Sequence, residues 1–348
     1  MFGLGSHEIV GVDIGSHSVK VVQLRRTSAH WIVTNAGIVD ISEKGADSPA
    51  RRETNCSRAL VNCVRVSGTG RKFAVCGVSG PEVAVRGFEF PAVPPEEVSR
   101  AVELEAKQVC PFNASDIAVD YHVMPDGKGK TKGYLVVAAG PLVKYKERVA
   151  RKGKLDCVLV DADALALLNC FKELEKPAEN HGTAILNIGH LETVLAVEGN
   201  GGWPFVRSFN YAGDSIIRSI GAENDATPDA VKAAFAGDPK DLPPAMHESF
   251  ERACKRLIDE VTKTIRYYGA QEGSFAVSKV LVCGGFSLFG DMAKLLNQQL
   301  AIEVTLWNPF EKMRLQVSRN HKGALLKTVL RRSGPALAVA AGLAMRSI

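Results

Sequence analysis

The sequence lacks three features that would each place it in a broad class of protein. No segment of its 348 residues reaches the ~18 apolar residues that a membrane-spanning helix needs, and no basic region followed by an apolar run opens the chain. Lysine and arginine are scattered, with a net charge of +5, and form no stripe with interleaved aromatic residues. We therefore expect a cytoplasmic protein that neither crosses a membrane nor binds nucleic acid.

The cysteines lack any Cys-x-x-Cys pair, although the chain contains eight of them. Cys56 and Cys63 could form a disulfide or share a metal ion, but no histidine lies at ligand spacing beside them. The eight cysteines as a set therefore indicate reduced, packed thiols. The composition is otherwise ordinary, with 46% hydrophobic and 23% charged residues. A chain of this length can bury a large core and form two domains, or one fold with lobes.

A strand–turn–strand segment near the start of the chain carries the first functional signal. Residues 9–12 and 19–24 are short apolar runs. The turn between them contains Asp13, Gly15, Ser16, Ser18 and Lys20. Gly15 can adopt backbone angles closed to other residues, so that amides and hydroxyls of the turn can converge on an anion. Taken alone, the segment fits either a phosphate-binding turn or an ordinary hairpin turn.

The same layout recurs in the second half of the chain. An apolar run at 183–188 includes Asn187 and is followed by Gly189, a short turn and a second apolar run that starts at Thr193. A third strand is expected at 203–211, as one is at 31–41 after the first hairpin. Two such hairpins about half a chain apart indicate an internal duplication and favour the phosphate-binding interpretation.

Further along, a buried strand at 277–282 runs into a strand-to-helix turn, Gly284-Gly285-Phe286, with glycines where a ligand or another backbone would approach closely. An alanine-rich apolar helix is expected at 335–345. It is short and lacks a polar face, so we expect it to pack into the core and not to anchor the chain to a membrane.

Several other stretches accompany these turns in a fixed order. They are Pro94–Glu97, Glu105–Phe112 with its Pro-Phe corner, Asp120–Val123, Tyr211–Asp214, Ile265–Tyr268, Trp307–Phe310 and Pro335–Ala344. With the two hairpins and the Gly-Gly turn, the chain resembles the actin-like ATPase superfamily, which includes actin, DnaK-type chaperones, sugar kinases and FtsA. Within it, the chain is most similar to the PilM family of type IV pilus assembly proteins, and the resemblance covers nearly the whole chain.

The resemblance implies an α/β fold of the actin-like ATPase type, in which duplicated RNase H-like domains form two lobes. The first lobe would span residues 1–175 and contain an inserted FtsA-type small α/β subdomain at about 90–152. The second lobe would span residues 176–348. Its C-terminal helix, 335–345, would pack back on the first lobe.

The resemblance also implies that ATP and Mg²⁺ bind between the lobes. The first loop would face the β- and γ-phosphates; its residues are Asp13, Gly15, Ser16, Ser18 and Lys20. Amides and hydroxyls would donate hydrogen bonds, Lys20 would supply positive charge, and Asp13 would hold Mg²⁺ through water. The second loop would lie on the opposite side of the phosphates, with Asn187, Gly189 and Thr193.

The nucleoside would lie against residues of the second lobe. Gly213 and Asp214 would lie beside the ribose, and Asp229 and Lys232, three apart on one helical face, would lie near the ribose and base. The plain alternative for Asp229 and Lys232 is a solvated helix pair. The adenosine would be backed by Gly284, Gly285 and Phe286.

The chain departs from the family pattern in the second loop. That loop usually begins with Asp, and Asn187 keeps a carbonyl oxygen but no negative charge, so Mg²⁺ binding should weaken. The turn His190-Leu191-Glu192 replaces small hydroxyl residues, and Asp229 is one methylene shorter than the usual Glu. These changes weigh against hydrolysis more than against nucleotide binding. No residue stands out as a base for the attacking water, so we expect at most a weak ATPase.

The leading interpretation is a cytoplasmic, nucleotide-binding scaffold of type IV pilus assembly or of a related secretion machine. In the family, a groove beside the small subdomain captures the cytoplasmic N-terminal peptide of PilN, a single-span inner-membrane protein. The protein would thereby be peripheral at the inner membrane, next to the pilus motor complex, with homo-oligomerisation left open. The alternatives are a weak ATPase or sugar-kinase-like phosphotransferase, a filament-forming protein like FtsA, and a type II secretion component of the same fold.

Overall fold

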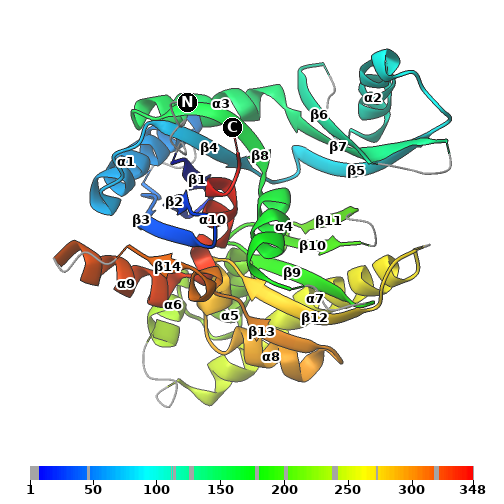
Figure 1. Ribbon diagram of the computed structural model, residues 1–348. Coiled ribbons are helices and arrows are strands. Elements are labelled where there is room, and N and C mark those ends of the chain that lie inside the picture. Colours follow the sequence, from blue (N-terminus) through cyan, green and yellow to red (C-terminus); the bar gives the residue numbers. More distant parts are fainter. Residues whose placement is uncertain are drawn as a thin grey trace.

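The computed structural model describes residues 8–44, 48–110, 112, 115–124, 129–176, 180–199, 203–236, 242–271, 273–316 and 321–347. Two lobes lie side by side, each built around one β-sheet, and a smaller three-stranded sheet extends from the first lobe (Figure 1). Within the described residues, no helix combines the length and the apolar character needed to cross a membrane. The α/β fold class predicted from the sequence is confirmed.

The first-lobe sheet has the strand order β14-β3-β2-β1-β4-β8. Its strands are β1 (Val10–Ile14), β2 (Ser18–Arg26), β3 (Trp31–Asp40), β4 (Phe73–Val78), β8 (Asp156–Ala162) and β14 (Arg314–Leu315). β1, β2 and β3 form an antiparallel meander, whereas β4 runs parallel to β1 and β8 runs parallel to β4. Helices α1 (Pro49–Ser67) and α3 (Gly140–Lys152) share a buried core with one face of this sheet.

The second-lobe sheet repeats this topology, in the order β11-β10-β9-β12-β13. Its strands are β9 (Gly182–Ile188), β10 (Thr193–Glu198), β11 (Pro204–Phe209), β12 (Val277–Cys283) and β13 (Glu303–Leu306). The duplication that the two hairpins predict is therefore present in the strand order. One face of the sheet packs with α5 (Gly213–Glu223), α6 (Pro228–Ala236), α7 (Pro244–Gly269) and α8 (Met292–Gln299).

The small sheet consists of antiparallel strands in the order β5-β7-β6. Its elements are β5 (Val83–Phe90), α2 (Pro95–Val109), β6 (Ile117–Met124) and β7 (Thr131–Ala139). Val98, Val102 and Ala106 of α2 pack on this sheet in a core of their own. The sequence places the subdomain at about 90–152. The small sheet begins with β5, and helix α3 contacts both the first lobe, at α1, β4 and β8, and the small sheet, at β6 and β7.

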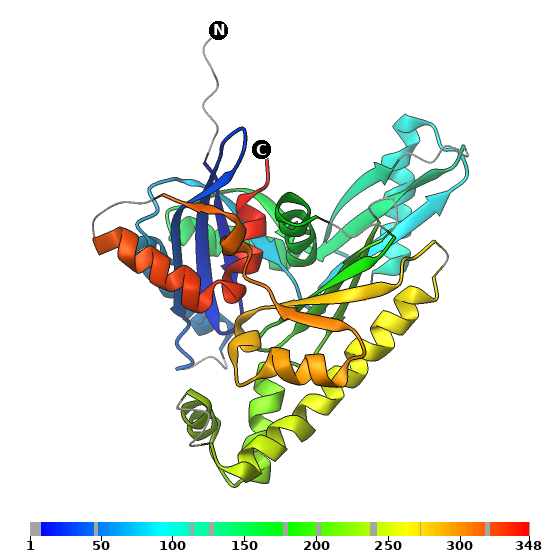
Figure 2. The same cartoon turned by 60° about the horizontal axis from the view of Figure 1, so that its bottom comes forward.

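Helices α4 (Asp163–Leu174) and α10 (Ala338–Ala344) lie between the two large sheets (Figures 1 and 2). They belong to one buried core that includes Leu24 of the first sheet and Ile185 of the second. Besides α8, β13 and β14, the described chain between β12 and α10 contains three short 3-10 turns and one further helix. These are η3 (Gly285–Leu288), η4 (Pro309–Lys312), α9 (His321–Ser333) and η5 (Pro335–Leu337).

Two glycines allow α10 to approach its neighbours closely. A Cβ atom on Gly11 of β1 would lie 2.0 Å from the Ala340 carbonyl oxygen, and a Cβ atom on Gly342 would lie 2.0 Å from the Ala166 carbonyl oxygen of α4. Both neighbours are backbone atoms, which cannot swing aside as the end of a side chain can. Glycine at these positions therefore fixes the distance between α10, the first-lobe sheet and α4.

We expect Gly342→Ala to destabilise the protein by about 1–3 kcal/mol, because the added methyl group forces α10 away from α4. The matched control is Gly269→Ala at the end of α7, where an added Cβ meets no atom within 4 Å. That change should be neutral or slightly stabilising, since alanine favours helix more than glycine does. Urea unfolding of both variants measures the difference, and equal midpoints would contradict the packing argument.

Candidate functional site

A cavity of about 900 Å³ lies between the β1–β2 hairpin of the first lobe and the β9–β10 hairpin of the second. Most of the site residues predicted from the sequence line it. They are Asp13, Gly15, Ser16, Ser18, Lys20, Asn187, Gly189, Lys232, Gly284, Gly285 and Phe286. The fold thus brings together two turns that are about 170 residues apart in the chain, as the duplicated topology requires.

The two hairpins close in the same way. The Gly15 N–H donates to the Ser18 carbonyl oxygen at 3.1 Å, and the Gly189 N–H donates to the Glu192 carbonyl oxygen at 2.9 Å. A Cβ atom on Gly189 would lie 2.7 Å from that carbonyl oxygen. The strand registers extend the equivalence, so that Asn187 occupies the position of Asp13 and Val194 that of Lys20.

An ion pair at the base of the first hairpin carries its charge. Asp13 and Lys20 face each other across β1 and β2, with Lys20 Nζ 3.0 Å from Asp13 Oδ2, and the two side chains are only 10% and 11% exposed. The equivalent pair in the second hairpin, Asn187 and Val194, has no charge. At the bases of the two hairpins, the cleft therefore has a charged pair on one side and an uncharged pair on the other.

The Gly-Gly turn closes the cleft against the second hairpin. Gly284 has φ +93°, a left-handed conformation that favours glycine. A Cβ atom on it would lie 2.4 Å from the Ile188 carbonyl oxygen and 2.5 Å from Asn187 Oδ1. Its N–H donates to the Pro335 carbonyl oxygen at 2.9 Å, which ties this turn to the segment that leads into α10.

Four predicted site residues are not among those that line the cavity. Thr193 is fully buried and its hydroxyl donates to the Tyr211 carbonyl oxygen. Gly213 packs against the ring of Phe286, since a Cβ atom on it would lie 2.5 Å from that ring. Its N–H donates to the Gly189 carbonyl oxygen at 3.1 Å.

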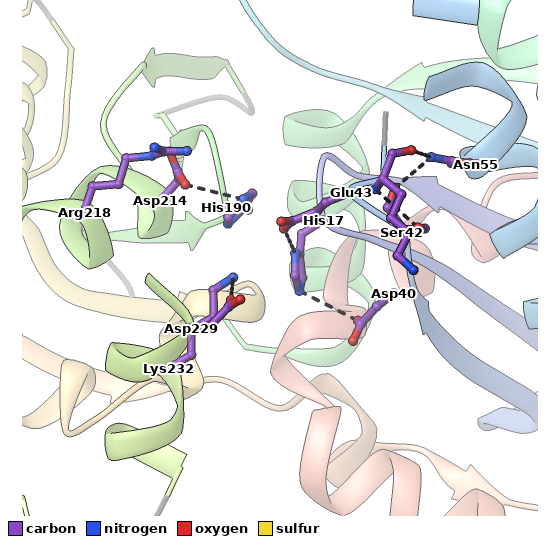
Figure 3. Close-up of polar contacts among 11 residues, drawn as sticks. His17, Asp40, Ser42, Glu43, Asn55, His190, Asp214, Arg218, Asp229 and Lys232 are labelled. Atoms are coloured by element: carbon purple, nitrogen blue, oxygen red, sulfur yellow. Dashed lines mark hydrogen bonds and ion pairs between the residues drawn. The ribbon is translucent and has the colours of Figure 1, made fainter. Parts of the chain in front are cut away.

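The other two are carboxylates with cationic neighbours (Figure 3). Asp214 is paired with Arg218 at 2.7 Å. The side chain of Asp229 is 92% exposed and lies 3.6 Å from Lys232. These four residues therefore support or flank the cleft walls in this structure.

A family sequence model for the type IV pilus assembly protein PilM matches residues 11–348. The chain belongs to the PilM family. A solved PilM–PilN type IV pilus biogenesis complex is similar over 98% of this chain and 98% of that chain, with 20% sequence identity and a TM-score of 0.81.

Two more distant structures share the fold. The ethanolamine utilization protein EutJ from Carboxydothermus hydrogenoformans is 12% identical, with 97% of this chain and 89% of that chain covered and a TM-score of 0.52. A diol dehydratase-reactivating factor in nucleotide-free form is 11% identical, with 97% and 99% covered and a TM-score of 0.53. This PilM-family protein thus has the actin-like ATPase fold.

The sequence analysis missed two buried charged residues of the cleft. Lys146 of α3 is 7% exposed, and its Nζ donates to the Ile14 carbonyl oxygen at 2.8 Å. This bond ties α3 to the start of the first hairpin turn. Asp163, at the start of α4, is also 7% exposed, and its Oδ1 has no hydrogen-bond partner among the described residues. An acidic residue directly after a parallel strand was the available signal for Asp163.

Two carboxyl groups of the cleft, those of Asp163 and Glu192, have raised pKa values. Burial and the nearby Asp13 carboxylate raise the pKa of Asp163 to about 7, although the Lys146 ammonium acts in the opposite direction. Burial also raises the pKa of Glu192, again against the effect of Lys146. This PilM-family cleft therefore holds an acid, Asp163, that can gain or lose a proton near neutral pH.

We expect Asp163→Asn to raise the stability of the protein more at about pH 8 than at about pH 5. The ordinary pKa of an aspartate is 3.8 and that of folded Asp163 is about 7, so its contribution to stability is lost as the pH rises through this interval. The variant has no such loss and should gain on the order of 1–3 kcal/mol at the higher pH. Urea unfolding at both pH values tests this, and an equal gain at both would contradict it.

Proposed function

We propose that this PilM-family protein is an actin-like scaffold that holds ATP between its lobes and captures an extended peptide of a PilN-like inner-membrane protein. The family match supports a role in type IV pilus assembly, and the similarity to a PilM–PilN complex supports the partner. Through that partner the protein would be held at the cytoplasmic face of the inner membrane, beside the pilus motor complex.

The observation that carries the peptide proposal is a groove of about 580 Å³ between β6 of the small sheet and β8 of the first-lobe sheet. Both are end strands in the order of the described strands. An end strand has one row of backbone N–H and C=O groups that no neighbouring strand satisfies. An extended peptide in this groove could pair with either row, which is the strand-addition mode of peptide recognition.

The walls of the groove suit a peptide with apolar side chains. Its apolar lining includes Val136, Ala138, Val158, Leu159, Leu165 and Leu168. Val158 of β8 is 40% exposed, so an apolar side chain of the peptide would remove it from water. Arg346 and the buried Asp161 form an ion pair at 3.2 Å in the same groove, which adds a polar group that can orient the peptide.

The proposal for ATP rests on the cavity between the hairpins. Lys20 and the glycine turns suit phosphate groups, and Asp13 is the carboxylate available for Mg²⁺ through water. Asn187 and Val194 offer no charge on the other side, so we expect weak Mg²⁺ binding and little or no hydrolysis. Nucleotide would then act by holding the two lobes together, which suits a scaffold better than an enzyme.

The peptide proposal predicts that Val158→Asp weakens binding of the PilN-like protein's cytoplasmic N-terminal peptide at least about tenfold, because a carboxylate would be buried beside apolar side chains. The matched control is Val61→Asp on α1, at a valine that is 48% exposed and lies outside the groove. Calorimetric titration with the synthetic peptide measures both. Equal affinities for the wild type and Val158→Asp would refute capture in this groove.

The nucleotide proposal predicts that Lys20→Gln lowers ATP affinity about tenfold or more, since a charge-assisted hydrogen bond to phosphate is lost. Lys294→Gln is the control, because Lys294 is 69% exposed on α8 and does not line the cavity. Titration with ATP and Mg²⁺, with circular dichroism of each variant to verify folding, measures the effect. Failure of the wild type to bind nucleotide would limit the function to peptide capture, and steady phosphate release would favour a weak ATPase.

A further inference from the structure

Two histidines and one glutamate from different lobes meet at the mouth of the cleft. His17 lies in the turn of the first hairpin, His190 in the turn of the second, and Glu43 in the loop after β3. Each offers one ligand atom, and the three atoms lie within 4.8 Å of one another. The imidazole rings of His17 and His190 have centroids 4.9 Å apart and planes tilted by 44°, and they lie next to each other between the lobes (Figure 3).

The nitrogen that His17 presents to this cluster lacks a hydrogen bond. His17 Nδ1 is buried and has no hydrogen-bond partner among the described residues. The nearest acidic atom is Glu43 Oε1 at 3.7 Å, which is too long for a hydrogen bond. A buried polar atom normally has a partner, so this nitrogen indicates a missing ligand between the three side chains.

Each histidine also has a carboxylate on its far side. His17 Nε2 lies 3.9 Å from Asp40 Oδ1, and His190 Nε2 lies 3.9 Å from Asp214 Oδ1. Both distances are longer than a hydrogen bond, but metal-bound histidines commonly hydrogen-bond their second nitrogen to a carboxylate, and a small shift of either side chain would form that contact. For His17 this leaves Nδ1, on the side of Glu43, for an ion.

The backbone holds both halves of the cluster in place. The Ile41 N–H donates to the His17 carbonyl oxygen at 2.8 Å, and the Asn55 amide donates to the Ser42 and Lys44 carbonyl oxygens on either side of Glu43. In the second lobe, the Asp214 N–H donates to the His190 carbonyl oxygen at 2.8 Å. Each half is therefore fixed within its own lobe, and only the distance between the lobes needs to adjust.

We propose that His17, Glu43 and His190 bind one Zn²⁺ ion that clasps the two lobes together at the tips of the hairpins. Two imidazoles and one carboxylate form a ligand set that suits Zn²⁺, with a fourth position for water, whereas Mg²⁺ prefers oxygen ligands. Tetrahedral Zn²⁺ places its ligand atoms about 3.3 Å apart, so the ion would draw the hairpins closer by on the order of 1 Å. His17 and His190 line the same cavity that is proposed for ATP, so the ion is tested in the absence of nucleotide; the peptide groove lies elsewhere.

The test is equilibrium binding of Zn²⁺ to the untagged full-length protein without nucleotide, with Co²⁺ absorption as a probe of coordination. We expect one ion per chain in the wild type, and at least about tenfold weaker binding in His17→Ala, His190→Ala and Glu43→Gln. His247→Ala is the matched control, because His247 on α7 also faces a carboxylate, Glu251, at 3.8 Å but lies outside the cleft.

Hydrogen exchange distinguishes a clasp from a site confined to one lobe. Zn²⁺ should increase amide protection at both hairpin turns, 15–18 and 189–192, in the wild type and in His247→Ala, but at neither turn in His190→Ala. Glu43 is an exposed side chain, so Glu43→Gln keeps the test valid if a histidine variant folds poorly. Zn²⁺ binding that is unaffected by these substitutions, or no binding by the wild type, would overturn the proposal.

Discussion

The close packing of α10 against β1 and α4 is the interaction on which the rest of the structure depends. Alanine and glycine let this helix lie between the two sheets, and the added atoms of larger side chains would meet backbone at Ala340 and Ala166. Because one continuous core joins α10, α4 and both sheets, each hairpin is held relative to the other. The cleft between the hairpins is thus a consequence of how the lobes share their core.

The two hairpins of the cleft have the same topology and the same turn closure, but they differ in the charge of their paired residues. Gly15 and Gly189 close their turns through equivalent hydrogen bonds. The charged pair of the first hairpin, Asp13 and Lys20, has a neutral counterpart in Asn187 and Val194. The two halves of the cleft therefore differ in charge at the positions where their strands pair beside the turns.

Elements with a strong local pattern could be predicted from the sequence. The hairpin strands and the strand β12 follow from apolar runs, and the turns beside them follow from glycines. Helix α9 and strand β14, near the C-terminal end, were not predicted because neither has a clear periodicity. β14 is also only a two-residue strand that pairs with β3. The sheet to which β5 belongs was also not evident from the sequence. β5 pairs with β7, a strand distant in the chain, and the residues of β5 alone do not indicate this partner.

The sequence by itself determined the two glycine-containing hairpin turns, their repetition and the absence of charge at Asn187, since each depends on residues adjacent in the chain. Only the tertiary structure decided which distant residues share a site. Asp163 and Lys146 reach the cleft from α4 and α3, and His17 meets His190 only because the lobes face each other. The groove between β6 and β8 likewise exists only once two sheets present their edges to each other. Contacts between lobes follow from packing, which periodicity within one segment does not encode.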